Sequence, residues 1–97
     1  MIVAISEMAY ADLESLSAYI EGEAGPEIAD AYDARIRAKI ETLADYPNRG
    51  TDRFMLGAGY RSITFERRLI TLYRIEQDVV TLIRALSAHR DLPGLTL

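Results

Sequence analysis

The sequence contains no cysteine and no tryptophan, and it has a single histidine, His89, and a single lysine, Lys39. The absence of cysteine excludes disulfides, thiolate zinc sites and cysteine nucleophiles, and it fits a reducing cytoplasm. One histidine excludes a histidine-rich metal site and an imidazole pair. No apolar run approaches the roughly 18 residues of a membrane span, and the N-terminus lacks the pattern of a secretory signal. We therefore expect a cytoplasmic protein with no metal, no cofactor and no membrane partner.

Charge is distributed unevenly along the chain. Residues 1–46 contain ten acidic side chains and three basic ones, whereas residues 47–97 contain eight arginines and five acidic side chains. The net charge of −4 argues against a nucleic-acid binder that works by bulk electrostatics, because such domains are usually strongly basic. Arginine makes planar, bidentate contacts with carboxylates and phosphates. The arginines of the second half are therefore the candidates for specific contacts.

Two helical segments are predicted after an N-terminal strand at residues 2–5. Ser6 suits the N-cap of the first helix, and apolar residues recur at helical spacing until Gly25. Pro26 suits the first position of the second helix, whose apolar periodicity continues until Pro47. Because only a few residues join the two helices, we expect an antiparallel hairpin.

Short strands are predicted in the second half of the chain. Runs rich in β-branched and aromatic residues indicate strands at residues 53–56, 60–66, 69–75 and 79–86. The connections after the second and third of these strands are short enough for hairpin turns. The expected fold is one α+β domain, residues 1–97, in which an N-terminal strand and an α-helical hairpin pack on a C-terminal antiparallel β-sheet.

Alternation along the strands predicts which side chains share a face of the sheet. A two-residue turn at residues 67–68 pairs Arg61 with Arg74, and a three-residue turn at residues 76–78 pairs Ile70 with Arg84. One apolar face with arginines at its margins then carries Arg61, Ile63, Phe65, Ile70, Leu72, Arg74, Val80, Leu82, Arg84 and Leu86. A slip of one residue in the second turn would move Arg84 to the opposite face.

No familiar catalytic constellation is present in the sequence. Residues 56–59, Leu-Gly-Ala-Gly, lack the pattern of a phosphate-binding loop, and the helical carboxylates are expected to face solvent. The candidates that remain are the four arginines Arg61, Arg74, Arg84 and Arg90. For any one of them, an internal pair with an acid is the better interpretation. Together beside apolar residues they suggest an anionic partner, because a charge near an apolar surface needs one.

The order of these motifs resembles the ParE/RelE toxin superfamily over nearly the whole chain. The matching segments are residues 11–20 (ADLESLSAYI), 25–50, 56–62 (LGAGYRS), 69–75 (LITLYRI), 82–86 (LIRAL) and 89–92 (HRDL). Each segment is a weak signal alone, but their order and spacing are fairly specific. In the family the histidine often follows the last strand's leucine directly, whereas Ser87 and Ala88 intervene before His89 here, which leaves the role of that histidine undefined.

The resemblance implies a toxin encoded beside an antitoxin, which inhibits it by laying an extended, helical C-terminal segment across it. Such antitoxins usually dimerise through a ribbon-helix-helix domain that binds operator DNA, so the toxin would meet DNA only through its partner. Apolar ridges on the hairpin and the sheet edge should bind the antitoxin. The residues assigned to this contact are Leu16, Ile20, Arg53 and Arg74. Because the second half of the toxin is basic, we expect acidic residues in the antitoxin segment.

The two branches of the superfamily differ in their target. ParE-like members act on DNA gyrase and are not nucleases, whereas RelE-like members enter the ribosome and cut mRNA. RelE-like sites add lysines and usually a C-terminal tyrosine to arginines resembling Arg61 and Arg84, but this chain has only Lys39 and no tyrosine after Tyr73. We therefore favour a gyrase inhibitor without catalytic residues that is neutralised by a ParD-like antitoxin.

The residues assigned to the target are Tyr60, Arg61, Arg84 and Arg90. Two alternatives stay open from the sequence. One is a RelE-like, ribosome-dependent mRNA endonuclease, and the other is an inactive or immunity-like relative that only binds its partner.

Overall fold

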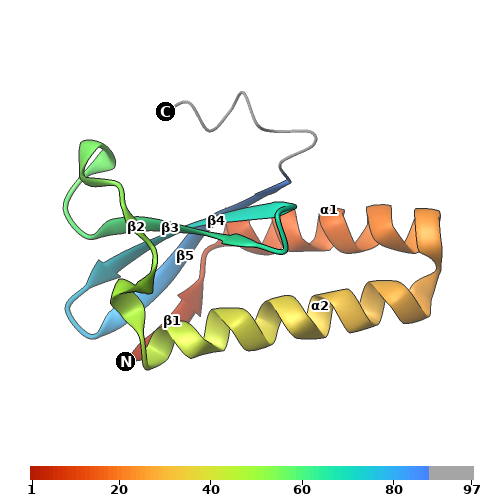
Figure 1. Cartoon of the computed structure of the whole chain (residues 1–97), viewed down its shortest axis with the longest axis horizontal. Helices are drawn as coiled ribbons and strands as arrows, with labels where there is room; N and C mark the ends of the chain where they lie inside the picture. The colour runs from red at the N-terminus through yellow and green to blue at the C-terminus, as the bar shows by residue number, and fades with distance from the viewer. Residues whose placement is uncertain (88–97) are drawn as a thin grey trace.

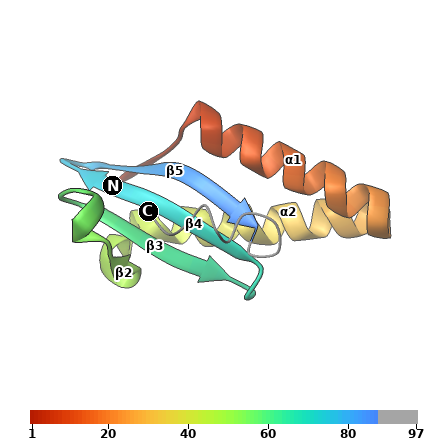
Figure 2. The same ribbon diagram turned by 90° about the horizontal axis from the view of Figure 1, so that it is seen from above.

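The structure, a computed structural model, describes residues 1–87 and has two layers (Figure 1). One layer is a helical hairpin of α1 (Glu7–Ala24) and α2 (Pro26–Glu41). The other is a five-stranded sheet made of β1 (Ile2–Ile5), β2 (Thr51–Asp52), β3 (Tyr60–Phe65), β4 (Leu69–Glu76) and β5 (Val79–Ser87). Three 3₁₀ turns, η1 (Thr42–Ala44), η2 (Pro47–Arg49) and η3 (Phe54–Leu56), lie between α2 and β3. The hairpin covers one face of the sheet, so the expected α+β class is confirmed (Figure 2).

The sheet is mixed because β1 joins it in parallel. The strands follow the order β1-β5-β4-β3-β2, and β2 to β5 form an antiparallel meander. β1 pairs in parallel with β5, where Ile2 lies opposite Val79 and Ile5 opposite Leu82. The sequence predicted the strand at residues 2–5 but did not assign its partner, which is the strand farthest from it in the chain.

Local chemistry explains where the helices begin and end. The Ser6 hydroxyl oxygen accepts the N–H of Ala9 at 3.1 Å, as an N-cap does, and the hydroxyl donates to the Ile83 carbonyl at 2.9 Å. Gly25 ends α1 with a φ of 94°, which disfavours side chains, and Pro26 opens α2. The predicted start and end of α1 and the predicted start of α2 are confirmed, whereas α2 ends at Glu41, before η1, and does not continue to Pro47 as predicted. Within residues 1–87, no helix is long and apolar enough to cross a membrane.

The core lies between the hairpin and the sheet. Its most deeply buried large side chains come from β4, β5 and η1 and are Tyr73, Leu43, Leu69, Leu82 and Val80. The helices contribute the residues that the periodicity predicted, among them Leu13 and Ile36, each 2% exposed. Burying side chains of this size contributes about 1.5–3 kcal/mol each. The helical layer is therefore fixed on one face of the sheet by ordinary hydrophobic packing.

The predicted strand at residues 53–56 is wrong. Residues 54–56 form the 3₁₀ turn η3, in which the Gly57 N–H bonds back to the Phe54 carbonyl at 3.0 Å. Phe54 and Met55 are 74% and 84% exposed, so their apolar character does not reflect burial in a strand. On the edge of β3 that faces away from β4, only the two residues of β2 pair with it.

The predicted register between β3 and β4 is also wrong by one residue. Arg61 pairs with Tyr73 and Ile63 with Thr71, instead of with Arg74 and Leu72. The cause is a three-residue turn at residues 66–68, in which Glu66 and Arg67 take positive φ values of 49° and 61°. A shift of one residue turns a whole strand over. The side chains of Arg61, Ile63 and Phe65 therefore face the helices.

The predicted register between β4 and β5 is wrong near the turn, and a β-bulge restores the predicted faces farther along β5. The turn has two residues, since Glu76 pairs with Val79, and Tyr73 then pairs with Leu82. Val80 and Leu82 consequently face the helices, contrary to the prediction. The register then shifts between Leu72 and Tyr73, so that Leu72 pairs with Arg84. Beyond this bulge, Arg84 and Leu86 return to the face of Leu72, as the sequence predicted.

Candidate interaction surface on the helix-free face of the sheet

The sheet face that points away from the hairpin gathers three of the predicted site residues, Tyr60, Arg74 and Arg84. Tyr73 is fully buried and Ile75 packs against the core, so alternation places Leu72 and Arg74 on the opposite face. The strand pairing then brings the following residues to what we call the helix-free face: Tyr60, Ser62, Ile70, Leu72, Arg74, Arg84 and Leu86. An apolar centre flanked by arginines is thus present, although the β3 residues differ from those predicted.

Arg74 and Tyr60 form a stacked pair on this face. They lie opposite each other on β4 and β3, and the guanidinium carbon is 5.2 Å from the centre of the tyrosine ring. One terminal nitrogen lies 3.6 Å from the Glu76 carboxylate. The Arg74 Nε is buried and has no hydrogen-bond partner among the described residues. A buried N–H donor that is left unused is costly, so this group is suited to receive an acceptor from another molecule.

Arg53 extends this pair toward β2. Its backbone N–H donates to the Tyr60 carbonyl at 2.8 Å, and its Nε donates to the Ser62 hydroxyl at 2.7 Å. Arg53, Tyr60 and Arg74 therefore lie together, and we call these three residues the Arg53–Tyr60–Arg74 cluster. The sequence assigned Tyr60 to the target and the two arginines to the antitoxin, whereas the structure places all three on one surface.

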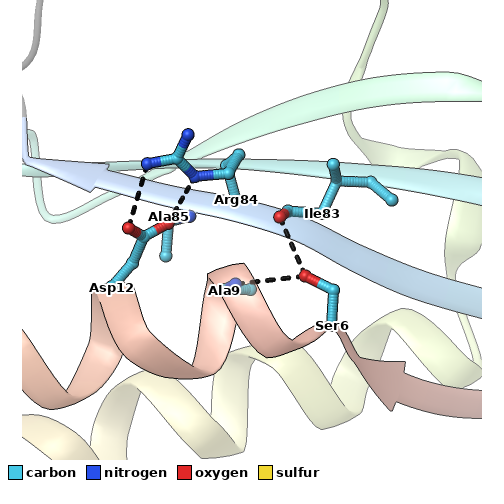
Figure 3. Close-up of polar contacts among 6 residues, drawn as sticks. All are labelled: Ser6, Ala9, Asp12, Ile83, Arg84 and Ala85. Carbon is cyan, nitrogen blue, oxygen red and sulfur yellow. Dashed lines mark hydrogen bonds and ion pairs between the residues drawn. The ribbon is translucent and has the colours of Figure 1, made fainter.

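Arg84 lies on the same face but is held by an acid of α1 (Figure 3). Its Nε and Nη2 donate to the two oxygens of Asp12 at 2.8 and 3.0 Å. The same carboxylate accepts the backbone N–H of Ala85 at 2.9 Å. Because β1 pairs with β5 only as far as Leu82, Asp12 takes the place of a neighbouring strand along the next part of the β5 edge. Sequence patterns do not predict this contact, since Asp12 follows the ordinary pattern of an exposed helical acid.

The side chain of Arg61 is used in contacts within the protein. It donates to the carbonyls of Asn48 at 3.2 Å and Gly50 at 2.8 Å, and it lies 3.9 Å from the Asp52 carboxylate. Of the residues assigned to the target, Tyr60 and Arg84 share the helix-free face, and Arg61 lies on the other side. Arg90, like His89, lies outside the described residues.

The two helix residues assigned to the antitoxin are directed inward. Ile20 is 9% exposed and belongs to the core, and Leu16 packs against it. The large apolar side chains that α1 and α2 expose are instead Met8, Tyr10, Tyr19 and Ile28, each more than half exposed. The assignment of Leu16 and Ile20 stays a prediction, and their partner would contact only the edges of these side chains.

Three ionisable side chains of residues 1–87 have pKa values shifted in directions that do not suit acid–base catalysis near neutral pH. A hydrogen bond from Arg35 lowers the pKa of Glu66, and burial raises the pKa of Tyr32 and of Tyr73. All three shifts move away from neutral pH, whereas a general acid or base works best with a pKa near it. The described residues contain no group of three or more histidine, cysteine or acidic ligands for a metal ion. The arrangement suits binding.

Fold and surface together describe a small α+β protein whose candidate site suits the binding of another macromolecule. The sequence profile of a family described as the ParE toxin of type II toxin-antitoxin system, parDE, matches residues 3–92. The chain therefore belongs to the ParE toxin family. A solved structure described as the chromosomal ParDE TA system from P. aeruginosa is similar in fold, with 24% identity, a TM-score of 0.78, and coverage of 90% of this chain and 95% of that chain. No curated protein matches the sequence.

Proposed function

We propose that this ParE-family toxin inhibits DNA gyrase by binding it and has no catalytic residue of its own. A ParD-like ribbon-helix-helix antitoxin neutralises it, and the toxin contacts operator DNA only through that antitoxin. The observation that supports this best is the Arg53–Tyr60–Arg74 cluster on the helix-free face, with its unused Arg74 Nε.

The cluster has the composition of a protein-binding hot spot. Tyrosine and arginine are enriched among the residues that dominate binding energy, and they act best where neighbouring apolar groups exclude water. Leu72 and Ile70 supply such groups on the same face. The tyrosine ring holds the Arg74 guanidinium in place before binding, which lowers the entropy that a partner must overcome.

A DNA supercoiling assay with purified gyrase tests the target. Free toxin should block supercoiling, and added antitoxin should restore it. Arg74→Ala should raise the toxin concentration needed for inhibition by about tenfold or more, since hot-spot truncations cost about 2 kcal/mol or more. Arg37→Ala is the matched control, because Arg37 pairs with Asp33 on α2, away from this face, and should leave inhibition unchanged.

Three results would contradict parts of the proposal. Unaltered supercoiling at excess toxin would exclude gyrase as the target. Cleavage of translated mRNA, mapped by primer extension, would identify a RelE-like endonuclease instead. Normal growth of cells that express the toxin without its antitoxin would indicate an inactive relative.

A further inference from the structure

The Arg74 guanidinium has an unpaired edge that two other arginines of the chain use to bind acids. Arg35 and Arg84 each hold one carboxylate through Nε and Nη2, at 2.8 and 3.1 Å for Arg35 and at 2.8 and 3.0 Å for Arg84. The Nε of Arg74 has no hydrogen-bond partner among the described residues. Its Nη2 lies 3.6 Å from the Glu76 carboxylate, which is too far for a hydrogen bond. The edge of Arg74 that suits a carboxylate is therefore not used within residues 1–87.

Arg53 adds a second positive charge beside this edge. Its Nε donates to the hydroxyl of Ser62, a residue that is only 7% exposed, so this hydrogen bond fixes the guanidinium against β3. None of the ion pairs within residues 1–87 includes Arg53. Asp52, its neighbour in the chain, lies 3.9 Å from Arg61 on the other side of the sheet. The cluster therefore has two arginines beside the single carboxylate of Glu76.

Two glycines before Tyr60 support this pair of charges. A Cβ at Gly57 would lie 3.0 Å from the Tyr60 ring, so the ring lies close to the glycine backbone. Gly59 contacts the Ile75 backbone, and the Ile75 N–H donates to the Gly59 carbonyl at 2.9 Å. Both glycines have positive φ values, 137° and 84°, which disfavour side chains. These glycines therefore hold the ring on which Arg74 stacks.

The surroundings of the cluster favour a protein carboxylate over a nucleic-acid backbone. Nucleic acids bind extended basic surfaces that neutralise several phosphates at once. On the helix-free face, however, Arg84 is already paired with Asp12, and Glu76 places a negative charge beside Arg74. The chain as a whole has a net charge of −4. A single planar carboxylate matches the one unpaired edge of Arg74, because a guanidinium binds carboxylates through two parallel hydrogen bonds.

We propose that gyrase presents an aspartate or glutamate side chain to this cluster, and that its carboxylate binds Arg74 side-on through Nε and Nη2. Arg53 supplies the second positive charge next to it. In the free toxin Glu76 is an internal competitor, since it attracts the guanidinium without forming the bidentate contact. This inference rests on the proposed function, because it specifies the chemical group on gyrase that the cluster recognises.

The contact requires only a small rearrangement of the free toxin. The Arg74 Nε is buried, so the guanidinium must turn about its side-chain bonds before a carboxylate can reach this atom. The side chains of Arg74 and Glu76 are 38% and 66% exposed, and an exposed ion pair contributes little stability. A partner carboxylate forms two charge-assisted hydrogen bonds, which are stronger than the long contact with Glu76. The exchange therefore favours the partner.

Arg74→Lys tests the bidentate geometry, because lysine keeps the charge but lacks the planar fork. Its affinity for purified gyrase, measured by surface plasmon resonance, should fall about tenfold, nearly as far as that of Arg74→Ala. Arg37→Lys is the matched control and should bind like the wild-type toxin, since Arg37 pairs with Asp33 on α2. Wild-type affinity of Arg74→Lys would overturn the inference, because one positive charge of any shape would then suffice.

Glu76→Gln has the opposite expected sign. It removes the competing charge beside Arg74, so affinity for gyrase should rise about threefold. Asp78→Asn is the control, because it changes the net charge equally, and Asp78 forms none of the ion pairs within residues 1–87. An increase in affinity cannot arise from damage to the fold. Equal affinities of the two variants, or weaker binding by Glu76→Gln, would contradict the role of Glu76 as a competitor.

Tyr60 variants test the support of the guanidinium. Tyr60→Leu removes the ring and should weaken gyrase binding about threefold or more, because the stacking that holds Arg74 in place is lost. Tyr60→Phe keeps the ring and should bind within about twofold of the wild-type toxin. Equal affinities of Tyr60→Leu and Tyr60→Phe would exclude this support.

The single lysine of the chain makes the partner carboxylate identifiable. A carbodiimide couples an amine to a carboxylate without a spacer, so the amine introduced by Arg74→Lys should couple to an acidic residue of gyrase. Arg37→Lys, treated in the same way, should give only the products of the wild-type toxin. Mass spectrometry of the coupled peptides then identifies the acidic residue. If no product is specific to Arg74→Lys at saturating toxin concentration, the proposed contact is wrong.

The outcomes separate this inference from the proposed function. If the wild-type toxin does not bind gyrase, the proposed target is wrong and the inference fails with it. If Arg74→Ala weakens binding and Arg74→Lys restores it, the target stands and only the carboxylate contact fails. Binding of the wild-type toxin to DNA alone that Arg74→Ala abolishes would assign the cluster to phosphate groups and refute the inference.

Discussion

Replacing Asp12 by alanine should destabilise the free toxin far more than its position on a helix surface indicates. The carboxylate makes three hydrogen bonds across 72 and 73 residues of chain, two from Arg84 and one from the backbone of Ala85. It also closes the part of the β5 edge that β1 does not reach. Loss of this side chain therefore removes three hydrogen bonds that join α1 to the sheet.

The magnitude follows from what is left behind. Ala85 is 4% exposed, so its N–H would be left largely unsatisfied, which costs about 1–3 kcal/mol. The Arg84 side chain is 34% exposed and the Asp12 side chain 17%, so the screened ion pair adds about 1 kcal/mol at most. We expect a total loss of about 1–4 kcal/mol for Asp12→Ala. Asp12→Asn keeps an acceptor for Ala85 and should lose about 1 kcal/mol.

Urea unfolding of the purified toxin measures both changes as shifts in midpoint at constant slope. Asp33→Ala is the control, because Asp33 also lies in a helix and pairs with an arginine at 2.8 Å, but only with Arg37 one turn away. Both substitutions carry the same gain in helix propensity, so their difference isolates the contact with the sheet. A loss of unfolding free energy in Asp12→Ala that exceeds the loss in Asp33→Ala by less than about 1 kcal/mol would refute the structural role of Asp12.

Two further predictions concern the backbone and pH. Gly59→Ala should destabilise the protein by several kcal/mol, because its φ is 84° and a Cβ would meet the Ile75 carbonyl. Gly22→Ala lies in an open position of α1 and should stabilise the protein by about 0.5–1 kcal/mol. Urea unfolding measures both changes. Tyr73→Phe should cost about 1–3 kcal/mol, since the buried hydroxyl accepts the Gly50 N–H and donates to the Pro47 carbonyl. Burial raises the pKa of Tyr73 above its ordinary 10.0, so the contribution of this hydroxyl to stability should be constant below that pH and be lost as pH rises through the raised pKa. Tyr73→Phe should show a smaller fall in unfolding free energy over this alkaline range, and an equal fall would contradict the assignment.

The sequence predicted the helices and the class of fold because their signals are local. The Ser6 cap, Gly25 with Pro26, and helical periodicity each act within one or two turns of chain. Strand pairing failed where the outcome depended on turn conformation. Glu66 and Arg67 adopt positive φ values although neither is a glycine, so the sequence contains no signal for this turn conformation. The turn therefore has one residue more than predicted. The register of β3 was therefore beyond what side-chain alternation can specify.

The candidate site was predictable in composition but not in arrangement. Ile70, Leu72 and Arg74 of β4 were placed together correctly, since alternation within one strand needs no partner. Arg61 was misplaced with the register of β3 and proves to hold the loop around Gly50. The Arg84–Asp12 contact joins residues from opposite ends of the chain, and no spacing rule predicts it.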